Sequence, residues 1–407
     1  MTDMEGMKQI YGSGGISAFF TRKKRLETLF SSRFSDVPDV WFSSSGRAEV
    51  IGNHTDHNGG KVIVGALTCD ILAAVSGRED GVVEICAEEF HPIKFSLDDL
   101  SPKEGERGKS ISLARGVAHA LSRYGKLRGF RACTHGNIFR GAGVSSSAAF
   151  EVLVAEIFNV LSFDGRLTPM QKARAGQYAE NVFFGKPCGL LDQGGIALGG
   201  LHLMDFQNAE DPIVSPLPPL KNYSLIMTNT GGSHAGLTKH YALIRSEMEA
   251  VASFFQKRVL REVAFPEFLS RIPELRKKFG ERAVLRALHF FEENVRVEHA
   301  ANALLHGDKR SFLAQVRKSG ESSLSCLQNT HVAGSETQPV VLAMRLSERI
   351  VKEGAFRMQG GGFAGTVIAF LPKGEEGKYV HEMSRVFGKE NVHRTEIRAT
   401  GARQLEI

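Results

Sequence analysis

The chain has 407 residues, which is enough for two or three domains that each bury a real core. Hydrophobic residues make up 42% of it and charged residues 24%, an ordinary balance for a soluble globular protein. The formal net charge of +6 suits an anionic substrate such as a nucleotide, but a surface of mixed charge explains it more simply, so we expect no nucleic-acid partner.

The five cysteines and the N-terminal sequence bear on where the protein works. No two cysteines form a CxxC pair, and their odd number argues against a disulfide scaffold or a zinc site and for a reducing compartment. The first ten residues carry acidic side chains and no apolar core, so they do not resemble a secretion signal. No stretch reaches the ~18 uncharged apolar residues of a membrane-spanning helix. We therefore expect a cytoplasmic protein with no membrane partner.

In chain order, the first half begins with a predicted helix in residues 1–40, where apolar residues recur at roughly helical spacing. Next come apolar, β-branched runs at 62–76 and 81–85, which we expect to form adjacent strands joined by a hairpin, and then a short strand at 94–97. Helices are then predicted at 111–124, 148–161 and 169–183.

The second half follows a proline-rich stretch, residues 212–219. This stretch is the predicted boundary, because proline supplies neither hydrogen-bond donors for a sheet nor a helix interior. Beyond it we expect strands at 223–227 and 366–371 and helices at 282–305 and 340–351.

Strands and helices are mixed in both halves, and they do not alternate as in a regular βαβ protein. The sequence contains no internal repeat and no low-complexity tract. It therefore predicts an α+β architecture, with one domain in residues 1–211 and a second in residues 220–407.

Four segments carry groups suited to chemistry, and the first is residues 46–60. Its sequence, GRAEVIGNHTDHNGG, gathers Asn, His and Asp between glycine-bearing turns. Such side chains recognise hydroxyl groups, and a carboxylate such as Asp56 accepts two sugar hydroxyl bonds at once. A His/Asp metal site is the alternative, although the spacing of His54, Asp56 and His57 does not match a helical histidine pair.

The second segment, residues 141–149, runs directly into an apolar helix. Its small residues let backbone amides approach a ligand closely, and a helix start leaves unpaired N–H groups and about +0.5 of a charge. This combination predicts an anion site, for which phosphate is the usual occupant. An ordinary serine-capped helix start is the alternative, and the segment has no lysine, unlike the loop of P-loop NTPases.

The third segment is residues 187–193, PCGLLDQ, and Glu180 lies twelve residues before its aspartate, Asp192. Apolar side chains flank Asp192, so we expect it in a buried loop with Arg47 as its candidate partner. A turn aspartate that caps a helix is the alternative.

The fourth segment is residues 358–366, MQGGGFAGT, which leads into a predicted strand. Its glycines permit backbone geometry that is closed to other residues. Either the loop approaches a ligand closely, or it is a tight turn between two strands.

Taken together and in this order, the segments resemble the motifs of the GHMP kinase superfamily and, within it, of the galactokinases. Residues 46–60 are similar to the galactokinase signature that contains Gly-x-His-Thr-Asp-x-Asn-Gly-Gly, residues 141–149 to the phosphate loop, and residues 360–365 to the third, glycine-rich motif. The resemblance runs from about residue 20 into the C-terminal region. It implies a two-domain GHMP-kinase-like fold with the active site in the inter-domain cleft, where ATP and Mg²⁺ support phosphorylation of the anomeric hydroxyl of galactose.

The resemblance also implies roles for individual residues. Asp192 matches the catalytic aspartate, and Arg47 matches the arginine beside it. Ser147 and Glu180 match the positions that hold Mg²⁺. The phosphates of ATP would lie against the loop residues Gly141, Gly143, Ser145, Ser146, Ser147 and Ala148.

The sugar contacts are where the chain departs from the galactokinase pattern. Asn53 stands where the best-known galactokinases have a glutamate that reads the sugar near its sixth carbon, and His57 stands where they have tyrosine. Asparagine still donates and accepts hydrogen bonds, but the charge at this position is gone. The segment 228–234 stands where galactokinases carry a similar Asn-x-x-x-x-His stretch. The other residues that match sugar contacts are His54, Asp56, Gly189 and Tyr241.

Two alternative functions stay open. One is a kinase for a related sugar, such as galacturonate, arabinose or an N-acetylated hexosamine. Loss of a carboxylate at Asn53 would reduce repulsion toward a carboxylate at the sixth carbon, which gives galacturonate a physical basis. The other is a regulator that binds sugar and ATP without turnover. Such regulators tend to lose residues of the phosphate loop, whereas residues 146–149 are all present here.

Overall fold

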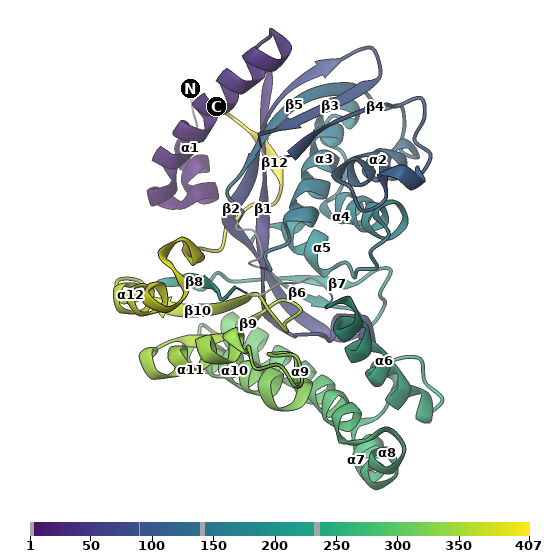
Figure 1. Cartoon of the computed structure of the whole chain (residues 1–407), viewed down its shortest axis with the longest axis vertical. Coiled ribbons are helices and arrows are strands. Elements are labelled where there is room, and N and C mark those ends of the chain that lie inside the picture. The colour runs from purple at the N-terminus through teal and green to yellow at the C-terminus, as the bar shows by residue number, and fades with distance from the viewer. Residues whose placement is uncertain (1–3, 89, 139–142, 232–236) are drawn as a thin grey trace.

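Two sheets organise the protein (Figure 1), whose computed structural model describes residues 4–88, 90–138, 143–231 and 237–407. The first sheet has the strand order β12-β1-β2-β5-β3-β4, with β6 paired to β2 and β7 paired to β6. Its strands are β1 (Val40–Ile51), β2 (Lys61–Arg78), β3 (Val82–Ala87), β4 (Phe90–Ser96), β5 (Gly129–Gly136), β6 (Leu201–Asp205), β7 (Ile213–Leu217) and β12 (Arg403–Leu405). The second sheet is antiparallel, with the order β11-β8-β10-β9, and consists of β8 (Tyr223–Asn229), β9 (Ala355–Gln359), β10 (Thr366–Pro372) and β11 (Val392–Thr395).

Helices cover both faces of the first sheet. Side chains alternate between the two faces of a strand, and β2 shows the consequence. Leu72 and Ala74 share an apolar cluster with α1, whereas Ala73 and Val75 pack with helices of the opposite face. The helices around this sheet are α1 (Met4–Phe34) on one side and α2 (Ser110–Ser122), α3 (Ser146–Phe163), α4 (Pro169–Tyr178) and α5 (Leu191–Leu198) on the other (Figure 1).

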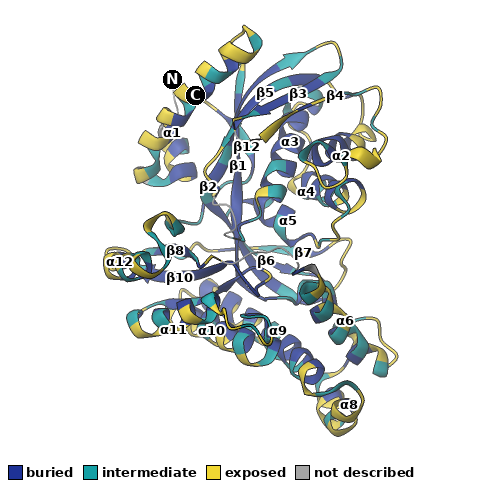
Figure 2. Ribbon diagram, viewed as in Figure 1, coloured by how far each residue is buried: buried dark blue, intermediate teal, exposed yellow. Residues whose placement is uncertain are grey.

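The second sheet is also covered on both faces. Ile226 of β8 packs with α11 and α12, whereas its neighbours Leu225 and Met227 belong to the cluster that contains α9 and α10. Figure 2 shows the central strands of both sheets as mostly buried and the edge strand β4 as largely exposed, with the other exposed residues mainly on the outer sides of the helices. The helices of this half are α6 (Thr238–Phe254), α7 (Phe265–Ser270), α8 (Ile272–Phe279), α9 (Glu281–Leu305), α10 (Lys309–Ser322), α11 (Pro339–Ile350) and α12 (Glu376–Phe387).

One apolar core joins the two sheets. It contains Val50 and Val64 from the first sheet, Met227 and Ile368 from the second, and Ala300 of α9, all of them buried. The long strands β1 and β2 run from the first sheet down toward the second (Figure 1). The contact between the halves is therefore a packed core.

The predicted hairpin between residues 62–76 and 81–85 is wrong. Both segments are strands, as β2 and β3, but β5 lies between them, antiparallel to β2 and parallel to β3. Phe130 and Ala132 of β5 pack on one face and Cys133 on the other, which suits a strand inserted at the centre of a sheet. A turn between two strands does not exclude a third strand from entering later in the chain.

The other predicted elements are present, with two differences in detail. The helix predicted at 169–183 is α4 followed by a π-helical turn, Ala179–Phe184. The proline-rich boundary contains a strand, β7, whose Pro216 is tolerated because β7 pairs only with β6 and lies at a sheet edge. The domain division at residues 211 and 220 stays a prediction, and β12 brings the end of the chain back to β1.

Helix α3 is the one helix of the described residues that is long and apolar enough for a membrane span. Of its 18 residues, 67% are buried inside the protein. Glu151 and Glu156, both buried, also interrupt its apolar sequence. These features are those of a core helix.

Candidate functional site

Arg47 and Asp192 form an ion pair between β1 and the first turn of α5. Arg47 Nε and Nη2 lie 2.8 and 2.7 Å from Asp192 Oδ1. Burial alone would raise the pKa of Asp192, but the charge of Arg47 and a hydrogen bond from Ser145 outweigh it, and the pKa is lowered. The predicted buried loop is wrong, because Asp192 lies in a helix and its side chain is 34% exposed. The predicted partnership with Arg47 is confirmed.

The loop before α3 is tied directly to this ion pair. Ser145 Oγ donates to the second oxygen of Asp192, and Arg47 Nη1 donates to the carbonyl of Gly143. Ser145 has φ 58°, in the left-handed region that non-glycine residues rarely adopt, and it precedes the first residue of α3. Backbone strain of this kind persists where surrounding contacts hold it, as they do here. Gly141 lies outside the described residues.

The first turn of α3 presents its free amides and serine hydroxyls to the same place. Ser146 is exposed, Ser147 is partly buried, and Ala148 is buried in the core with only 1% exposure. Ser147 Oγ donates to Glu180 Oε1 over 3.3 Å. The predicted phosphate-loop residues from Gly143 to Ala148 thus lie beside both Asp192 and Glu180.

Glu180 lies in the π-helical turn after α4 and is buried among polar groups. Lys186 Nζ lies 2.9 Å from Glu180 Oε1, and Gln193 Nε2 donates to Glu180 Oε2 at 3.0 Å and to Glu151 Oε2 at 2.9 Å. Glu151 is fully buried, and burial together with the nearby charge of Glu180 raises its pKa. The cluster therefore fixes Glu180 next to Ser147.

The donor set beside Ser147 fits a hard cation. A serine hydroxyl and a carboxylate oxygen are ligands that Mg²⁺ accepts, with the remaining positions taken by phosphate oxygens and water. Within the described part of the chain, no three His, Cys, Asp or Glu side chains form a cluster that could hold a metal. This finding gives no support to the alternative of a His/Asp site at residues 54–57.

Asp56 and Gly189 lie side by side. Asp56 begins a short 3-10 turn, Asp56–Asn58, and a Cβ atom at Gly189 would lie 2.5 Å from Asp56 Oδ2. Burial, followed by the charge of Glu49, raises the pKa of Asp56 to about 6, and Asp192 adds to this effect. The predicted sugar residues Asp56 and Gly189 therefore border the same space as Asp192.

His54 and His57 form a hydrogen-bonded pair with defined tautomers. His54 Nε2 donates to the carbonyl of Gly361 at 2.9 Å, so His54 Nδ1 is free to accept from His57 Nε2 at 3.3 Å. Asn58 Nδ2 in turn donates to His57 Nδ1 at 2.8 Å. Burial lowers the pKa of both imidazoles, so both are neutral at pH 7.

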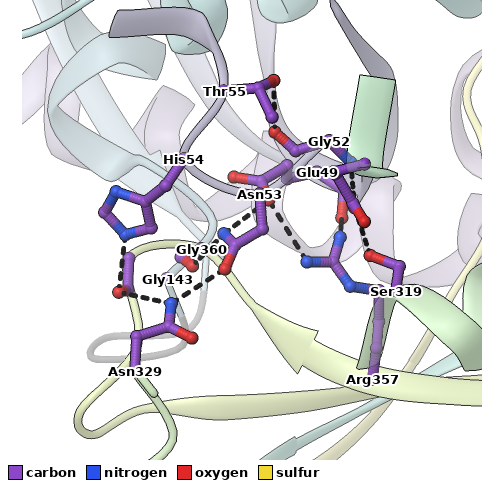
Figure 3. A network of polar contacts seen from close by, with 12 residues as sticks. Glu49, Gly52, Asn53, His54, Thr55, Gly143, Ser319, Asn329, Arg357 and Gly360 are labelled. Carbon is purple, nitrogen blue, oxygen red and sulfur yellow. Dashed lines mark hydrogen bonds and ion pairs between the residues drawn. The ribbon is translucent and has the colours of Figure 1, made fainter. Parts of the chain in front are cut away.

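Asn53 is fully buried at the centre of a polar network (Figure 3). Its Nδ2 donates to Glu49 Oε1 at 2.7 Å and to the carbonyl of Gly360 at 2.8 Å, and its Oδ1 accepts from Asn329 Nδ2 at 2.8 Å. Arg357 contacts Glu49 from the other side, at 3.4 Å. A contact between Asn53 and a sugar would require one of these bonds to be exchanged.

The glycine-rich segment connects β9 to β10 and also faces the phosphate loop. A Cβ atom at Gly360 would lie 3.5 Å from the carbonyl oxygen of Gly143. Tyr241 of α6 donates its hydroxyl to the carbonyl of Gly362 at 3.1 Å, and its ring lies against Gly361. The segment is therefore a turn between two strands, as one alternative predicted, and it borders the site. Its close approach to a ligand stays a prediction. Of the segment 228–234, residues 232–234 lie outside the described residues.

Sequence reasoning missed several residues that support the site. Gln193 directly follows Asp192, and its place in the same motif is a signal that could have found it. Glu49 lies in the first motif, residues 46–60, and could have been found by the same signal. Lys186, Asn329 and Arg357 carry no such signal, because their partners are set by the fold.

Comparisons with known proteins agree with this geometry. The galactokinase galactose-binding signature matches residues 28–77, and the GHMP kinase N-terminal domain matches residues 112–200. A crystal structure of Lactococcus lactis galactokinase complexed with galactose has a TM-score of 0.80 and 26% sequence identity, covering 93% of this chain and 98% of that one.

Two more distant structures share the fold. Mevalonate kinase from Methanococcus jannaschii has a TM-score of 0.62 at 14% identity, covering 88% of this chain and 98% of its own. Streptococcus pneumoniae phosphomevalonate kinase, solved with phosphomevalonate and AMPPNP, has a TM-score of 0.59 at 12% identity, covering 90% of this chain and 100% of its own. The α+β, two-sheet architecture is thus shared well beyond the sugar signature.

Proposed function

The chain belongs to the GHMP kinase superfamily and to its galactokinase branch, and on this premise we propose that it transfers the γ-phosphate of ATP to the anomeric hydroxyl of galactose. The observation that carries the proposal is the junction of three elements at one point. The Arg47–Asp192 pair, the start of α3 and the Asp56–Gly189 contact bring a carboxylate, an anion-binding helix start and a hydroxyl-binding loop together.

In the proposed mechanism Asp192 acts on the anomeric hydroxyl. Its lowered pKa keeps it ionised at neutral pH, so it can accept the hydroxyl proton or orient the oxygen for attack. The sugar oxygen bonds to the γ-phosphorus, the bond from this phosphorus to the oxygen bridging to the β-phosphorus breaks, and ADP leaves with that electron pair. Arg47 holds Asp192 in place and offsets charge on the transferred group.

The phosphates of ATP would lie at the start of α3, where Ser145, Ser146 and Ser147 supply hydroxyls and the helix supplies free amides. Ser147 and Glu180 would hold Mg²⁺, which would neutralise charge on the phosphates. Gly143 would let the phosphates approach the loop closely, and Gly141 stays a predicted contact of ATP.

For the sugar, we propose contacts with His54, Asp56, Gly189 and Tyr241. Asp56 suits two adjacent hydroxyls, and the absence of a side chain at Gly189 leaves room beside it. Galacturonate is disfavoured because Arg357, the buried arginine on the side of Asn53, is already paired with Glu49, so a further carboxylate would have no partner there.

ATP consumption with a panel of sugars tests the function. We expect galactose to give the highest kcat/KM, ahead of 6-deoxygalactose, galacturonate, arabinose, N-acetylgalactosamine and glucose, because hydroxyls placed for one epimer leave buried groups unpaired with another. If kcat/KM is higher for galacturonate than for galactose, galacturonate is the substrate in place of galactose. No ATP consumption with any sugar, together with measurable galactose binding, would favour the regulator.

Two broader assignments rest on the same proposal. We place the domain division between residues 211 and 220, with each half contributing one wall of the site. A cytoplasmic location is supported by Cys69, Cys86, Cys133, Cys188 and Cys326, which are all free thiols.

A further inference from the structure

The glycine-rich loop 360–365 is held from outside by four side chains. Figure 3 shows those of Asn53, His54 and Asn329, and the last donates to the carbonyl of Gly361 at 3.1 Å. The carbonyls of its first three residues accept hydrogen bonds from Asn53, His54 and Tyr241, at 2.8, 2.9 and 3.1 Å. Asn53 and His54 belong to the sugar-signature segment in the first half of the chain, whereas the loop joins two strands of the second sheet. These bonds therefore tie the two halves together at the site itself.

The amide of Asn53 is fully used in this contact. One Nδ2 hydrogen goes to the loop, the other goes to Glu49 Oε1 at 2.7 Å, and Oδ1 accepts from Asn329. Because Asn53 is 0% exposed, water cannot replace a lost partner. A carboxylate here would have no hydrogen to donate and would face the carboxylate of Glu49.

Glu49, the charged neighbour of Asn53, has one buried arginine as its partner. Arg357 is 0% exposed, and its Nη2 lies 3.4 Å from Glu49 Oε1 while its Nη1 donates to the backbone carbonyl of Glu49 at 3.2 Å. A second carboxylate at this place would leave a buried negative charge without a partner. Loss of the Glu49 charge would in turn leave the guanidinium without one.

Resting on the proposed function, we propose that Asn53 is a positioning residue that fixes the glycine-rich loop against the sugar-binding segment, and that Glu49 and Asn53 work as one unit carrying a single charge. The loop lies against the ring of Tyr241, a proposed sugar contact, and its Gly360 lies against Gly143 of the phosphate loop, so displacement of the loop acts on the sugar and on ATP. The charge that galactokinases carry at the position of Asn53 is thus placed at Glu49 in this chain.

The test is a double-mutant cycle of Asn53→Glu, Glu49→Gln and the double variant in the full chain. We measure KM for galactose and for ATP, and hydrogen exchange of the amides of residues 356–366. Asn53→Glu should raise KM for galactose roughly 10- to 100-fold, raise KM for ATP as well because Gly360 faces Gly143, and speed exchange in the loop. In the double variant one carboxylate again faces Arg357, so KM should fall at least about tenfold from that of Asn53→Glu.

Two controls keep the outcome clear. Asn302→Glu adds the same charge at an exposed position of α9 and should change neither readout. Asn53→Ala removes the donors without adding charge, so it should loosen the loop even if Asn53→Glu does not fold, and Glu49→Gln should not rescue it. Unchanged loop exchange in both Asn53 variants, or a double variant no better than Asn53→Glu, would overturn the proposal. Hydrogen exchange needs no turnover, so a parent protein inactive on every sugar would count against the function alone.

Discussion

Both carboxylate oxygens of Asp192 already have a partner. Arg47 takes Oδ1, and Ser145 donates to the other oxygen from a backbone in the left-handed region. A sugar hydroxyl that approaches Asp192 must therefore share or displace the bond from Ser145, while the bonds from Arg47 stay in place. The hydrogen bond from Ser145 thus determines which lone pairs of Asp192 are available to a sugar hydroxyl.

Replacing Asp192 by asparagine keeps the size of the side chain and removes both the proton acceptor and the charge facing Arg47. We expect kcat to fall by about 10²–10⁴, the range for a positioned acid–base group, with galactose and ATP binding retained. Asp164→Asn is the matched control, because Asp164 is exposed and its left-handed backbone suits asparagine. A kcat within threefold of the parent would mean that Asp192 is structural only.

Asp56 should give the sugar site a pH dependence. Its pKa is raised to about 6 by burial and then by Glu49, and the ionised form is the better hydroxyl acceptor. KM for galactose should therefore rise about tenfold for each pH unit below 6, and Asp56→Asn should remove this slope while weakening binding at every pH.

The same shift has a consequence for stability. The pKa of Asp56 in the folded protein lies above its ordinary value of 3.8, so the fold favours the neutral form. The stabilisation that the neutral Asp56 carboxyl gives to the folded protein is present at low pH and is lost as the pH rises from about 4 through about 6. Asp56→Asn should accordingly raise the free energy of unfolding at pH 8 and leave it nearly unchanged at pH 4; the opposite order would show that the carboxylate is stabilised as an anion.

Glu180→Gln tests the cation site. The variant loses a charged oxygen beside Ser147, so the Mg²⁺ concentration for half-maximal rate should rise by roughly tenfold or more. Glu210→Gln, at an exposed turn, serves as the control. If the two Mg²⁺ titration curves coincide with that of the parent, Glu180 does not hold the cation.

How far the sequence predicts these residues depends on where their partners come from. The pair Arg47 and Asp192 could be predicted because each lies in a recognisable motif. The ion pair of Glu49 with Arg357 could not, since it joins strands of different sheets and Arg357 does not stand out in the sequence. Asn53 was identified but was predicted as a sugar contact, because its burial follows only from the packing of the second half.

At the scale of elements, the local patterns predicted strands and helices well but not their neighbours. Residues 62–76 and 81–85 are strands as expected, yet β5 separates them. The strand β1 went unpredicted because its residues Ser43, Ser44 and Ser45 break the apolar pattern, although all three are buried. Whether a segment forms a strand depends on its own residues, whereas the strands it pairs with in a sheet depend on the topology of the whole chain.

Helix α5 carries Asp192, and its far end is packed against the turn before β12. A Cβ atom at Gly401 would overlap the carbonyl oxygen of Ala197 in α5. We expect Gly401→Ala to lower the free energy of unfolding by about 1–3 kcal/mol and to lower kcat, because α5 must move. Thermal unfolding and steady-state kinetics measure both effects.

Gly377→Ala is the control for Gly401→Ala. Nothing lies within 4 Å of a Cβ atom at Gly377, which is exposed in α12, so alanine there should stabilise the protein by up to about 1 kcal/mol. Equal stability of the two alanine variants would mean that the turn at Gly401 adjusts without moving α5.

For the whole molecule, the shared core predicts cooperative unfolding. Buried side chains of β1, β2, β8, β10 and α9 form one cluster, so neither sheet can lose its packing alone. Trp41, the single tryptophan, reports on the first sheet, whereas far-ultraviolet circular dichroism reports on the helices of both halves. In a urea titration the two signals should give the same midpoint. Two separate midpoints would show that the halves unfold independently.

The pairing of β12 with β1 also bears on how the protein is made. On the ribosome, β1 and α1 leave the exit tunnel early, but β12 follows only after the whole second sheet has been synthesised. Until then the edge of β1 has unpaired backbone groups, and the apolar cluster around Trp41 lacks Leu405. The nascent first half is therefore a chain with an open sheet edge, the kind of surface that chaperones bind and that aggregates when synthesis stalls.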